Sequence, residues 1–464
     1  MTGLFATPAV LPAMAGAVPT NINTSAAHGN EAEDAIAVNP TNPKNIVTMA
    51  TLPFPVVAGL FEGISFDGGK TWTRQVIGSS TADPLGDICC DEQLAWDGFG
   101  NLWMTYLLNS NGDVLVALST DGGRTFHKTA DVIVTGVGTG PGGSKNLRTN
   151  NPNIFGDQPS ISAGLNSVWI SFTNVPSEVI QAFGFPVTGL GQYGPLTPTQ
   201  AVPTSAGRGD YGDTAVGPNG QVLVTYQDAT NGQGGSHIYT ALDANGLQPG
   251  GFADPRLLAR SRVGGFDYIA AQPDRSIDAE ANLAWDRSGG PHNGRVYAIW
   301  TQETPNESDN TDIMFQYSDN NGATWTPAVR LNSDHTVNSQ FMPSIAVDQA
   351  SGDVAVSWYD CRNDLGTGGP GDTDGVPNDD AQIWATYSTD GGATFAPNFR
   401  VSAGTFNAPD AQSFFDYGDY THAAFQSHLF YPAWSDNSNS TGDNPDGTLH
   451  QLDLFTARVT IPAH

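Results

Sequence analysis

The stretch Ser65-Phe-Asp67-Gly-Gly69-Lys-Thr71-Trp72 carries the main information about the fold, because it recurs along the chain. Further copies begin at Ser119, Ser318 and Ser388 and keep the pattern S-x-D-x-G-x-T-[WF], except that Asn320 replaces Asp in the third. In such a turn the Asp accepts backbone N–H bonds, glycine supplies a positive φ, and the aromatic side chain fills the gap between strands. The element therefore predicts a repeated hairpin corner.

A second pattern pairs a short apolar strand with an aromatic-rich strand across a turn containing Gly, Asn or Asp. It occurs seven times, at residues 34–48, 92–106, 159–172, 213–226, 281–300, 343–358 and 422–434. The spacing, on average roughly 65 residues, suits one four-stranded propeller blade with long loops. We expect an all-β chain with a seven-bladed β-propeller over residues 18–464 as one domain. Six blades are the alternative, if the weak third blade is miscounted.

Ring closure is predicted from the two ends of the propeller domain. The last repeat has three recognisable strands, the third over residues 449–459, and residues 18–24 precede the first repeat. We expect the amino-terminal segment to supply the fourth strand of the last blade, because this pairing removes an exposed edge.

Four copies of the corner resemble the Asp-box, or BNR repeat, of the sialidase-like (neuraminidase superfamily) propellers. The resemblance implies that the boxes are structural corners on the face opposite the active site. It also implies a carbohydrate-active enzyme of the exo-sialidase-like glycoside hydrolase type, which uses an arginine triad, a tyrosine nucleophile assisted by a glutamate, and an aspartate acid/base. The first repeat lacks the family's Arg-Ile-Pro. A polysaccharide lyase and a non-catalytic glycan- or protein-binding propeller therefore stay open.

Charge narrows the possible partners. The 464 residues include 47 Asp and Glu against 18 Lys and Arg, a net charge of −29. Such a surface repels phosphate backbones and anionic lipids, so we expect no nucleic-acid partner and no membrane insertion. We expect the protein to be a monomer and its partner to be a glycan or polysaccharide. Residues 1–17 are apolar and uncharged, as a signal-peptide remnant or a simple tail would be, and the expected location is extracellular or periplasmic.

The three cysteines leave two arrangements open. Cys89 and Cys90 are adjacent, so they form either a vicinal disulfide or unpaired thiols, and Cys361 lies far away in sequence. Neither arrangement has the CxxC spacing of a metal site.

Acidic residues gather where the inner strand of each blade is expected to begin. A ring of carboxylates there suits a cation or acid/base chemistry on a sugar, although a repeated Asp could equally cap neighbouring backbone N–H groups. The resemblance and this position together give the candidate catalytic residues Asp91, Glu92, Tyr211, Glu280 and Tyr417.

Basic side chains on the same loops are candidates for substrate binding. A guanidinium binds a carboxylate or sulfate group bidentately, or else neutralises one of the nearby acids. The candidate substrate-binding residues are Arg148, Arg208, Arg275, Asp213 and Asp419.

The insert Gly371-Asp-Thr-Asp374-Gly-Val-Pro-Asn-Asp379-Asp380 is predicted to be a Ca²⁺ loop. Its carboxylates Asp372, Asp374, Asp379 and Asp380 are hard oxygen ligands, and its glycines allow the chain to bend. The alternative is a solvated acidic loop. No organic cofactor is expected.

Overall fold

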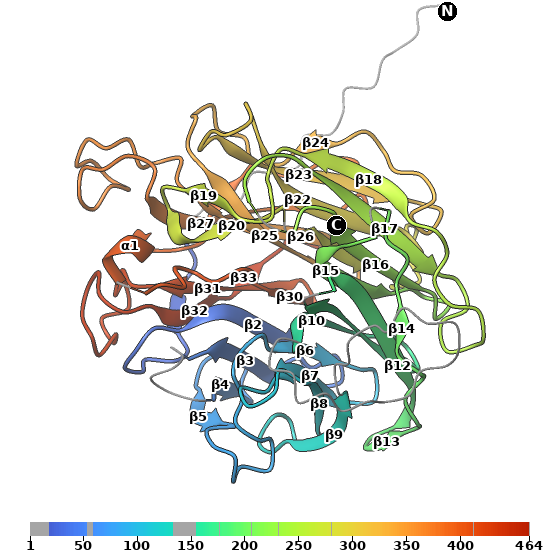
Figure 1. Cartoon of the computed structure of the whole chain (residues 1–464). Helices are drawn as coiled ribbons and strands as arrows, with labels where there is room; N and C mark the ends of the chain where they lie inside the picture. Colours follow the sequence, from blue (N-terminus) through green and yellow to red (C-terminus); the bar gives the residue numbers. More distant parts are fainter. Residues whose placement is uncertain are drawn as a thin grey trace, which may run out of the picture.

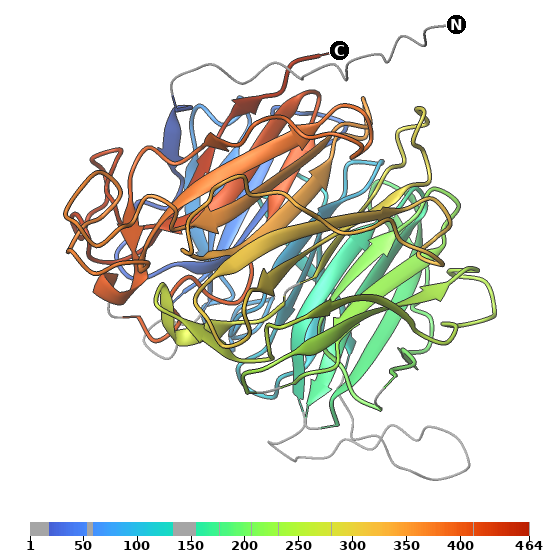
Figure 2. The ribbon, with the colours of Figure 1, turned by 90° about the horizontal axis from the view of Figure 1, so that it is seen from above.

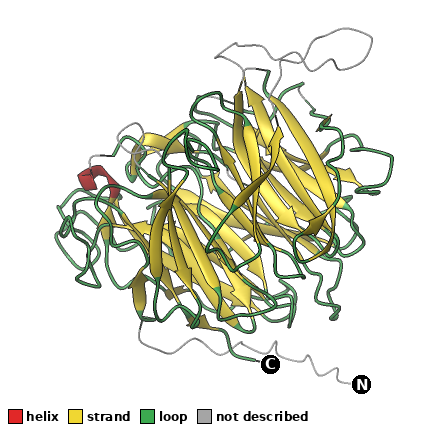
Figure 3. Ribbon diagram, turned by 90° about the horizontal axis from the view of Figure 1, so that it is seen from below, coloured by secondary structure: helices red, strands yellow, loops and turns green. Residues whose placement is uncertain are grey.

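A computed structural model describes residues 18–52, 59–132, 155–175, 177–205, 207–230, 232–279, 281–411 and 413–463. Seven antiparallel sheets, each with four main strands, are arranged as blades around a common axis (Figures 1 and 2). Within the described residues, the secondary structure is almost entirely β-strand and loop (Figure 3). The prediction of a seven-bladed β-propeller is confirmed, and the six-bladed alternative is not.

The first four blades follow one another along the chain, and their strands have these bounds. Blade 1 contains β2 (Ala32–Val38), β3 (Ile46–Thr51), β4 (Leu60–Ser65) and β5 (Thr73–Ile77), and blade 2 contains β6 (Gln93–Trp96), β7 (Leu102–Leu107), β8 (Val114–Ser119) and β9 (His127–Val132). Blade 3 contains β10 (Phe155–Ala163), β11 (Ser167–Val175), β12 (Val179–Gly189) and β13 (Gln192–Tyr193), with β14 (Gln200–Ala201) also pairing with β12. Blade 4 contains β15 (Asp210–Val216), β16 (Val222–Gln227), β17 (Ser236–Asp243) and β18 (Arg256–Ser261).

The last three blades complete the ring. Blade 5 contains β21 (Asn282–Trp285), β22 (Val296–Glu303), β23 (Thr311–Ser318) and β24 (Val329–Arg330). Blade 6 contains β25 (Gln340–Val347), β26 (Val354–Asp360), β27 (Asp380–Ser388) and β28 (Phe399–Arg400), with β29 (Phe406–Asn407) also on β27. Blade 7 contains β30 (Ala423–Gln426), β31 (Leu429–Asp436), β32 (Asp453–Ala457) and β1 (Asn21–Asn23), with β33 (Val459–Thr460) also on β31.

The ring closes as expected from the two ends of the domain. Strand β1 pairs antiparallel with β32, with Asn21 opposite Ala457 and Asn23 opposite Phe455. The Asn23 amide also donates a 2.6 Å hydrogen bond to Asp453 Oδ2. The inner strands β2, β6, β10, β15, β21, β25 and β30 each contact the next one around the ring, including β30 with β2.

The Asp-boxes form the corners between the third and fourth strands of four blades. In blade 1, Asp67 Oδ1 accepts the N–H of Thr71 at 3.0 Å, and Asp67 Oδ2 accepts its hydroxyl at 2.7 Å. Asn320 makes the equivalent bonds, because its Oδ1 accepts the N–H of Thr324 and its Nδ2 donates to the Thr324 hydroxyl, both at 2.9 Å. The box acids are therefore framework.

Glycine is required at the box of blade 2 for two reasons. Gly123 has a φ of 95°, which L side chains rarely adopt, and a Cβ there would lie 2.7 Å from Val47 Cγ2 of blade 1. The corner of one blade thus rests directly on its neighbour. Apolar side chains fill the remaining space between blades, as where Trp103 of blade 2 meets Phe185 of blade 3 edge-on at a centroid distance of 4.9 Å.

Two elements lie in segments that the sequence indicated only as loops. The hairpin of β19 (Asp267–Ile269) and β20 (Gln272–Ile277) precedes blade 5, and α1 (Ala408–Ala411) precedes blade 7. Both project from the same end of the propeller (Figure 1), and β20 contacts α1. No helix among the described residues is long and apolar enough to cross a membrane.

Candidate functional site

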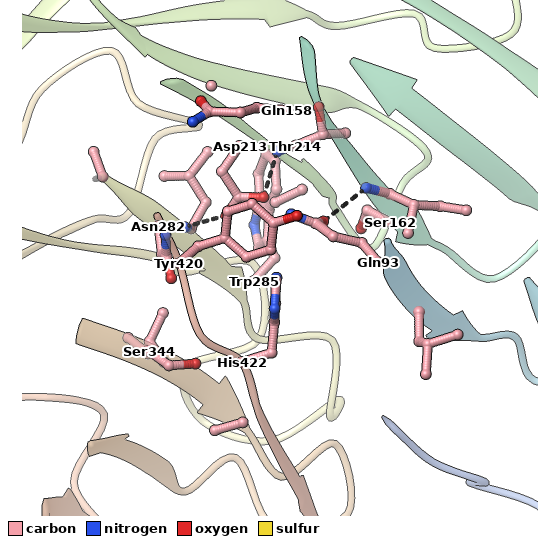
Figure 4. A pocket seen from close by; sticks show the side chains of 18 of the residues that line it. Gln93, Gln158, Ser162, Asp213, Thr214, Asn282, Trp285, Ser344, Tyr420 and His422 are labelled. Carbon is pink, nitrogen blue, oxygen red and sulfur yellow. Dashed lines mark hydrogen bonds between the residues drawn. The ribbon is translucent and has the colours of Figure 1, made fainter. Parts of the chain in front are cut away.

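A cavity of about 200 Å³ lies along the propeller axis and is lined mainly by the inner strands. Figure 4 shows side chains from different blades around this space, among them Gln158, Asp213, Ser344, Tyr420 and His422. The lining runs from Tyr211, Asp278 and Asp419 at one end to Trp285 and Arg287 at the other. A concave space with convergent polar groups is the usual position of a ligand site.

Backbone bulges at the start of the inner strands shape the mouth of this channel. The register shifts between Ala32 and Ala35, between Asp157 and Ser160, and between Asp210 and Asp213. The first of the two residues inside each shift has a positive φ, which is 62° at Glu33, 44° at Gln158 and 51° at Tyr211. A bulge redirects the side chain that it carries. The repeated bulges therefore bring polar residues of blades 1, 3 and 4 to one end of the channel.

Arg275 and Asp419 form an ion pair at this mouth. Arg275 lies on the β19–β20 hairpin, and its Nη2 donates to Asp419 Oδ2, just before blade 7. The Asp419 side chain is 8% exposed and that of Arg275 29%. Gln158 also donates to Asp419 Oδ2, at 3.1 Å, so three separate parts of the chain meet at this carboxylate.

Several further carboxyl groups lie within electrostatic range of this ion pair. Burial, with the Asp91 and Asp419 charges, raises the pKa of Glu33 to about 8, and Arg275 opposes the rise. Burial also raises the pKa of Asp91 to about 6, against a 2.9 Å hydrogen bond from the Gln158 N–H. The pKa of Asp157 is raised by burial and by the neighbouring Asp91. The mouth thus holds protonated and ionised carboxyl groups together near neutral pH.

Glu92 and Tyr211, two predicted catalytic residues, occupy different depths. Glu92 is fully buried, with Oε2 accepting the Thr51 hydroxyl at 2.9 Å, and burial and Glu33 raise its pKa. Tyr211 is only partly buried and lines the cavity. Its pKa is raised by burial and by the Asp278 and Asp419 charges, so its hydroxyl stays protonated and is able to donate a hydrogen bond.

Asp213 holds blades together. Its Oδ1 accepts the Ser160 hydroxyl of blade 3 at 2.6 Å, and its Oδ2 accepts the Leu283 N–H of blade 5 at 2.7 Å. Two further polar residues of the channel lining, Asn282 and Ser344, come from blades 5 and 6. His422 is bonded through Nδ1 to the Asp34 carbonyl at 3.0 Å, and burial lowers its pKa to about 4, so it is neutral. Through these hydrogen bonds, Asp213 and His422 stabilise the channel wall.

Two further predicted residues, Tyr417 and Arg208, make their contacts away from the Arg275–Asp419 ion pair. Tyr417 is fully buried, with its ring 4.6 Å from that of Tyr359 and its hydroxyl bonded to Phe406 O and Ala408 N, so it belongs to the core. Arg208 is half exposed and lies 3.8 Å from Glu178. Arg148 and Glu280 lie outside the described residues. Of the two predicted arginines that the structure describes, Arg275 lies at the ring of carboxyl groups.

The cysteines are settled by the structure. Cys89 and Cys90 form a vicinal disulfide, and Cys361 is a buried free thiol. The disulfide directly precedes Asp91, whose φ is 58°.

The predicted Ca²⁺ loop folds its carboxylates together. Oxygens of Asp374, Asp379 and Asp380 lie within 4.8 Å of one another, as do oxygens of Asp364, Asp372 and Asp380. The structure adds Asp364, which lies before Gly371 in the same connection between β26 and β27, to the four carboxylates that the sequence indicated.

Sequence reasoning missed three polar residues, namely Glu33, Gln158 and Asp364. Glu33 and Gln158 occupy the position that Asp91 and Tyr211 hold in their own blades: each has a positive φ and lies two residues before regular pairing of the inner strand, so superposing the repeats could have found them. No pattern in the sequence indicated Asp364. It comes close to Asp380 only because the insert folds back on itself.

The fold and its corners define the class of this protein: it is an Asp-box β-propeller. The family model described as BNR/Asp-box repeat matches residues 64–74, the first box. A comparison with curated protein sequences finds no match.

Solved structures with a similar fold include three enzymes. The polysaccharide lyase Uly1 has 9% identity and a TM-score of 0.49, covering 94% of this chain and 90% of its own. The α-L-arabinofuranosidase Arb93A from Fusarium graminearum, in complex with an iminosugar inhibitor, has 14% identity and a TM-score of 0.46, covering 75% and 93%. The Trypanosoma rangeli sialidase, in complex with the inhibitor DANA, has 11% identity and a TM-score of 0.41, covering 93% and 55%.

Proposed function

We propose that this protein is a glycoside hydrolase that cleaves a glycan at the channel mouth. One observation carries the proposal: the Arg275–Asp419 ion pair lies beside Asp91, whose pKa is raised to about 6. Glycosidic bond hydrolysis needs one carboxyl group that donates a proton and one that stays ionised. The mouth supplies both kinds of group.

Asp91 is the proposed general acid. A carboxyl group with a pKa of about 6 is still partly protonated near neutral pH and can donate its proton to the leaving glycosidic oxygen. Its Oδ2 is held by the Gln158 N–H at 2.9 Å, which fixes the direction of the carboxyl group. Glu33, with a pKa of about 8, supplies a second protonated group close by.

Asp419 is the proposed ionised partner. It is ion-paired with Arg275, and as a carboxylate it would stabilise the positive charge that develops on the sugar ring or activate a water molecule. Tyr211 lines the cavity near the same residues, and its protonated hydroxyl can donate to a sugar oxygen.

Arg275 is the proposed contact for an anionic or strongly polar substituent of the sugar. It lies among Glu33, Asp91, Asp157 and Asp419, and its pKa is raised chiefly by Asp419. Without this guanidinium the mouth would repel an acidic sugar.

The test is a glycan panel assayed for reducing-sugar release and for ultraviolet-absorbing unsaturated products. The wild-type protein should release reducing sugar without the unsaturated product. Asp91→Asn and Asp419→Asn should each lower kcat/KM by about 10²–10⁴-fold, the usual contribution of an acid/base group. Asp254→Asn is the matched control, because it removes an exposed acid that is distant in sequence from both Asp91 and Asp419.

Three other outcomes would each reject the proposal. An unsaturated product would identify a lyase instead. Binding of glycans without turnover across the panel would identify a non-catalytic propeller. Unchanged turnover in both variants would place the chemistry at other residues.

A further inference from the structure

We propose that the long insert of blade 6, residues 361–379, together with Asp380 forms a Ca²⁺ site. The insert connects β26 to β27 and supplies Asp364, Asp372, Asp374 and Asp379. Two groups of carboxylate oxygens, joined through Asp380, each lie within 4.8 Å. Oxygens on opposite sides of a Ca²⁺ ion that ligates at roughly 2.4 Å are roughly 4.8 Å apart. This proposal is independent of the proposed hydrolase activity.

Asp379 provides the second observation that points to a cation. Its side chain is 6% exposed, and no hydrogen-bond donor among the described residues reaches its Oδ1. One of its carboxylate oxygens belongs to the group with Asp374 and Asp380. A buried carboxylate oxygen without a donor is costly unless a cation or a proton satisfies it.

No basic side chain of the described residues forms an ion pair with these acids. The neighbouring Arg362 is bound to Asp360 at 2.6 Å and lies over the Trp384 ring at 4.1 Å. Among the described residues, the donors that offset the cluster's negative charge are therefore uncharged: backbone N–H groups, a hydroxyl and the Asn407 amide.

Those donors hold the carboxylates in place. The N–H groups of Asp379 and Asp380 donate to Asp364 Oδ2 at 2.8 and 2.9 Å. Asp372 accepts the Gly375 N–H at 2.7 Å, and Asp380 accepts the Thr373 hydroxyl at 2.7 Å. Each carboxylate can still offer further lone pairs to an ion. The donor set is oxygen alone, which favours a hard cation, and an irregular loop suits Ca²⁺ better than the strict octahedron of Mg²⁺.

The site would fasten the insert to the mouth of the propeller. Asp380 is paired with Asn407 in β29, and the next residue, Ala408, donates its N–H to the Tyr417 hydroxyl at 3.0 Å. Tyr417 is followed within two residues by Asp419, which pairs with Arg275. A cation at Asp380 would thus stiffen the segment that carries Asp419.

Calorimetric titration of chelator-treated full-length protein with CaCl₂ tests the proposal, with MgCl₂ as the comparison. We expect one Ca²⁺ per chain and a higher Tm in Ca²⁺ than in an equal concentration of Mg²⁺. Asp379→Asn should abolish both effects. Asp374→Asn, at an exposed position that the fold tolerates, should weaken Ca²⁺ binding at least tenfold, whereas Asp254→Asn should bind like wild type. No Ca²⁺ binding by wild type at millimolar concentration, or unchanged binding in both loop variants, would overturn the proposal.

Discussion

Arg275 and Asp419 are 144 residues apart in the chain and form an ion pair at the mouth of the channel. The arginine comes from a hairpin inserted before blade 5, and the aspartate comes from the segment that leads into blade 7. Asp416 adds to this junction, because its Oδ2 accepts the N–H groups of Asp274 and Arg275, both at 2.9 Å. The hairpin is therefore fixed over the channel by two carboxylates of one loop.

The first prediction concerns this ion pair. Arg275→Met leaves Asp419 and its neighbouring acids without a cation and should lower the free energy of unfolding by about 3 kcal/mol. Asp419→Asn should lower the free energy of unfolding by less, because it removes one negative charge from a cluster of acids when it breaks the ion pair. In urea unfolding, the loss of unfolding free energy in the double variant should be smaller than the sum of the two single losses by about 1–2 kcal/mol. Additive losses would show that the two side chains are not coupled.

The second prediction concerns pH. Because the pKa of Glu33 is raised from 4.5 to about 8, the folded protein holds this proton more tightly than the unfolded chain. The stabilisation is complete below pH 4.5 and is lost as pH rises to 8. The free energy of unfolding should fall by up to about 1.4 kcal/mol per pH unit in this window from this group.

Glu33→Gln tests this effect, because the amide cannot ionise. Urea unfolding between pH 4.5 and 8 should show a shallower fall for Glu33→Gln than for wild type, whereas Asp254→Asn should follow the wild-type curve. Parallel curves for wild type and Glu33→Gln would contradict the assignment.

The third prediction concerns the corners. Asp390 accepts both the N–H and the hydroxyl of Thr394, at 2.9 and 2.6 Å. Asp390→Ala should lower the free energy of unfolding by about 1–2 kcal/mol. Asp390→Asn should lose much less, because Asn320 in blade 5 also accepts the Thr324 N–H and bonds to its hydroxyl, there as the donor. Equal losses in thermal or urea unfolding would mean that the charge, and not the hydrogen-bond pattern, matters at this corner.

The fourth prediction concerns ring closure. Deleting residues 1–24 removes β1 and exposes the edge of β32, including Asp453 without its Asn23 partner. Compared with a deletion of residues 1–17 alone, the longer deletion should lower the Tm by several degrees and increase aggregation. Differential scanning calorimetry and light scattering measure both effects. Matching melting temperatures would show that β1 does not lock the ring.

The fifth prediction concerns the cysteines. Thiol titration with Ellman's reagent should find no reactive thiol in the native protein, because Cys89 and Cys90 are joined and Cys361 is buried. Unfolding without reductant should expose one thiol, and full reduction should expose three. Three thiols before reduction would exclude the vicinal disulfide.

The sequence by itself determined the propeller. The four corner motifs predict a propeller, and the seven strand pairs predict the number of blades, because both are local patterns repeated along the chain. The unpaired strand at the amino terminus and the three-stranded last repeat predict how the ring closes. The sequence also predicts the blade 6 insert as a Ca²⁺ loop, with a solvated acidic loop as the alternative, because its carboxylates lie close together along the chain.

Only the tertiary structure decided which polar residues meet. Bulges that place Glu33 and Gln158 at the mouth are backbone irregularities, and no residue type reveals them alone. Tyr417 resembles the other aromatic candidates in sequence but packs in the core, whereas Arg275 reaches Asp419 from a hairpin that looked like a loop. The physical reason is that a site between blades depends on contacts across the ring, and these contacts join residues with no shared local pattern.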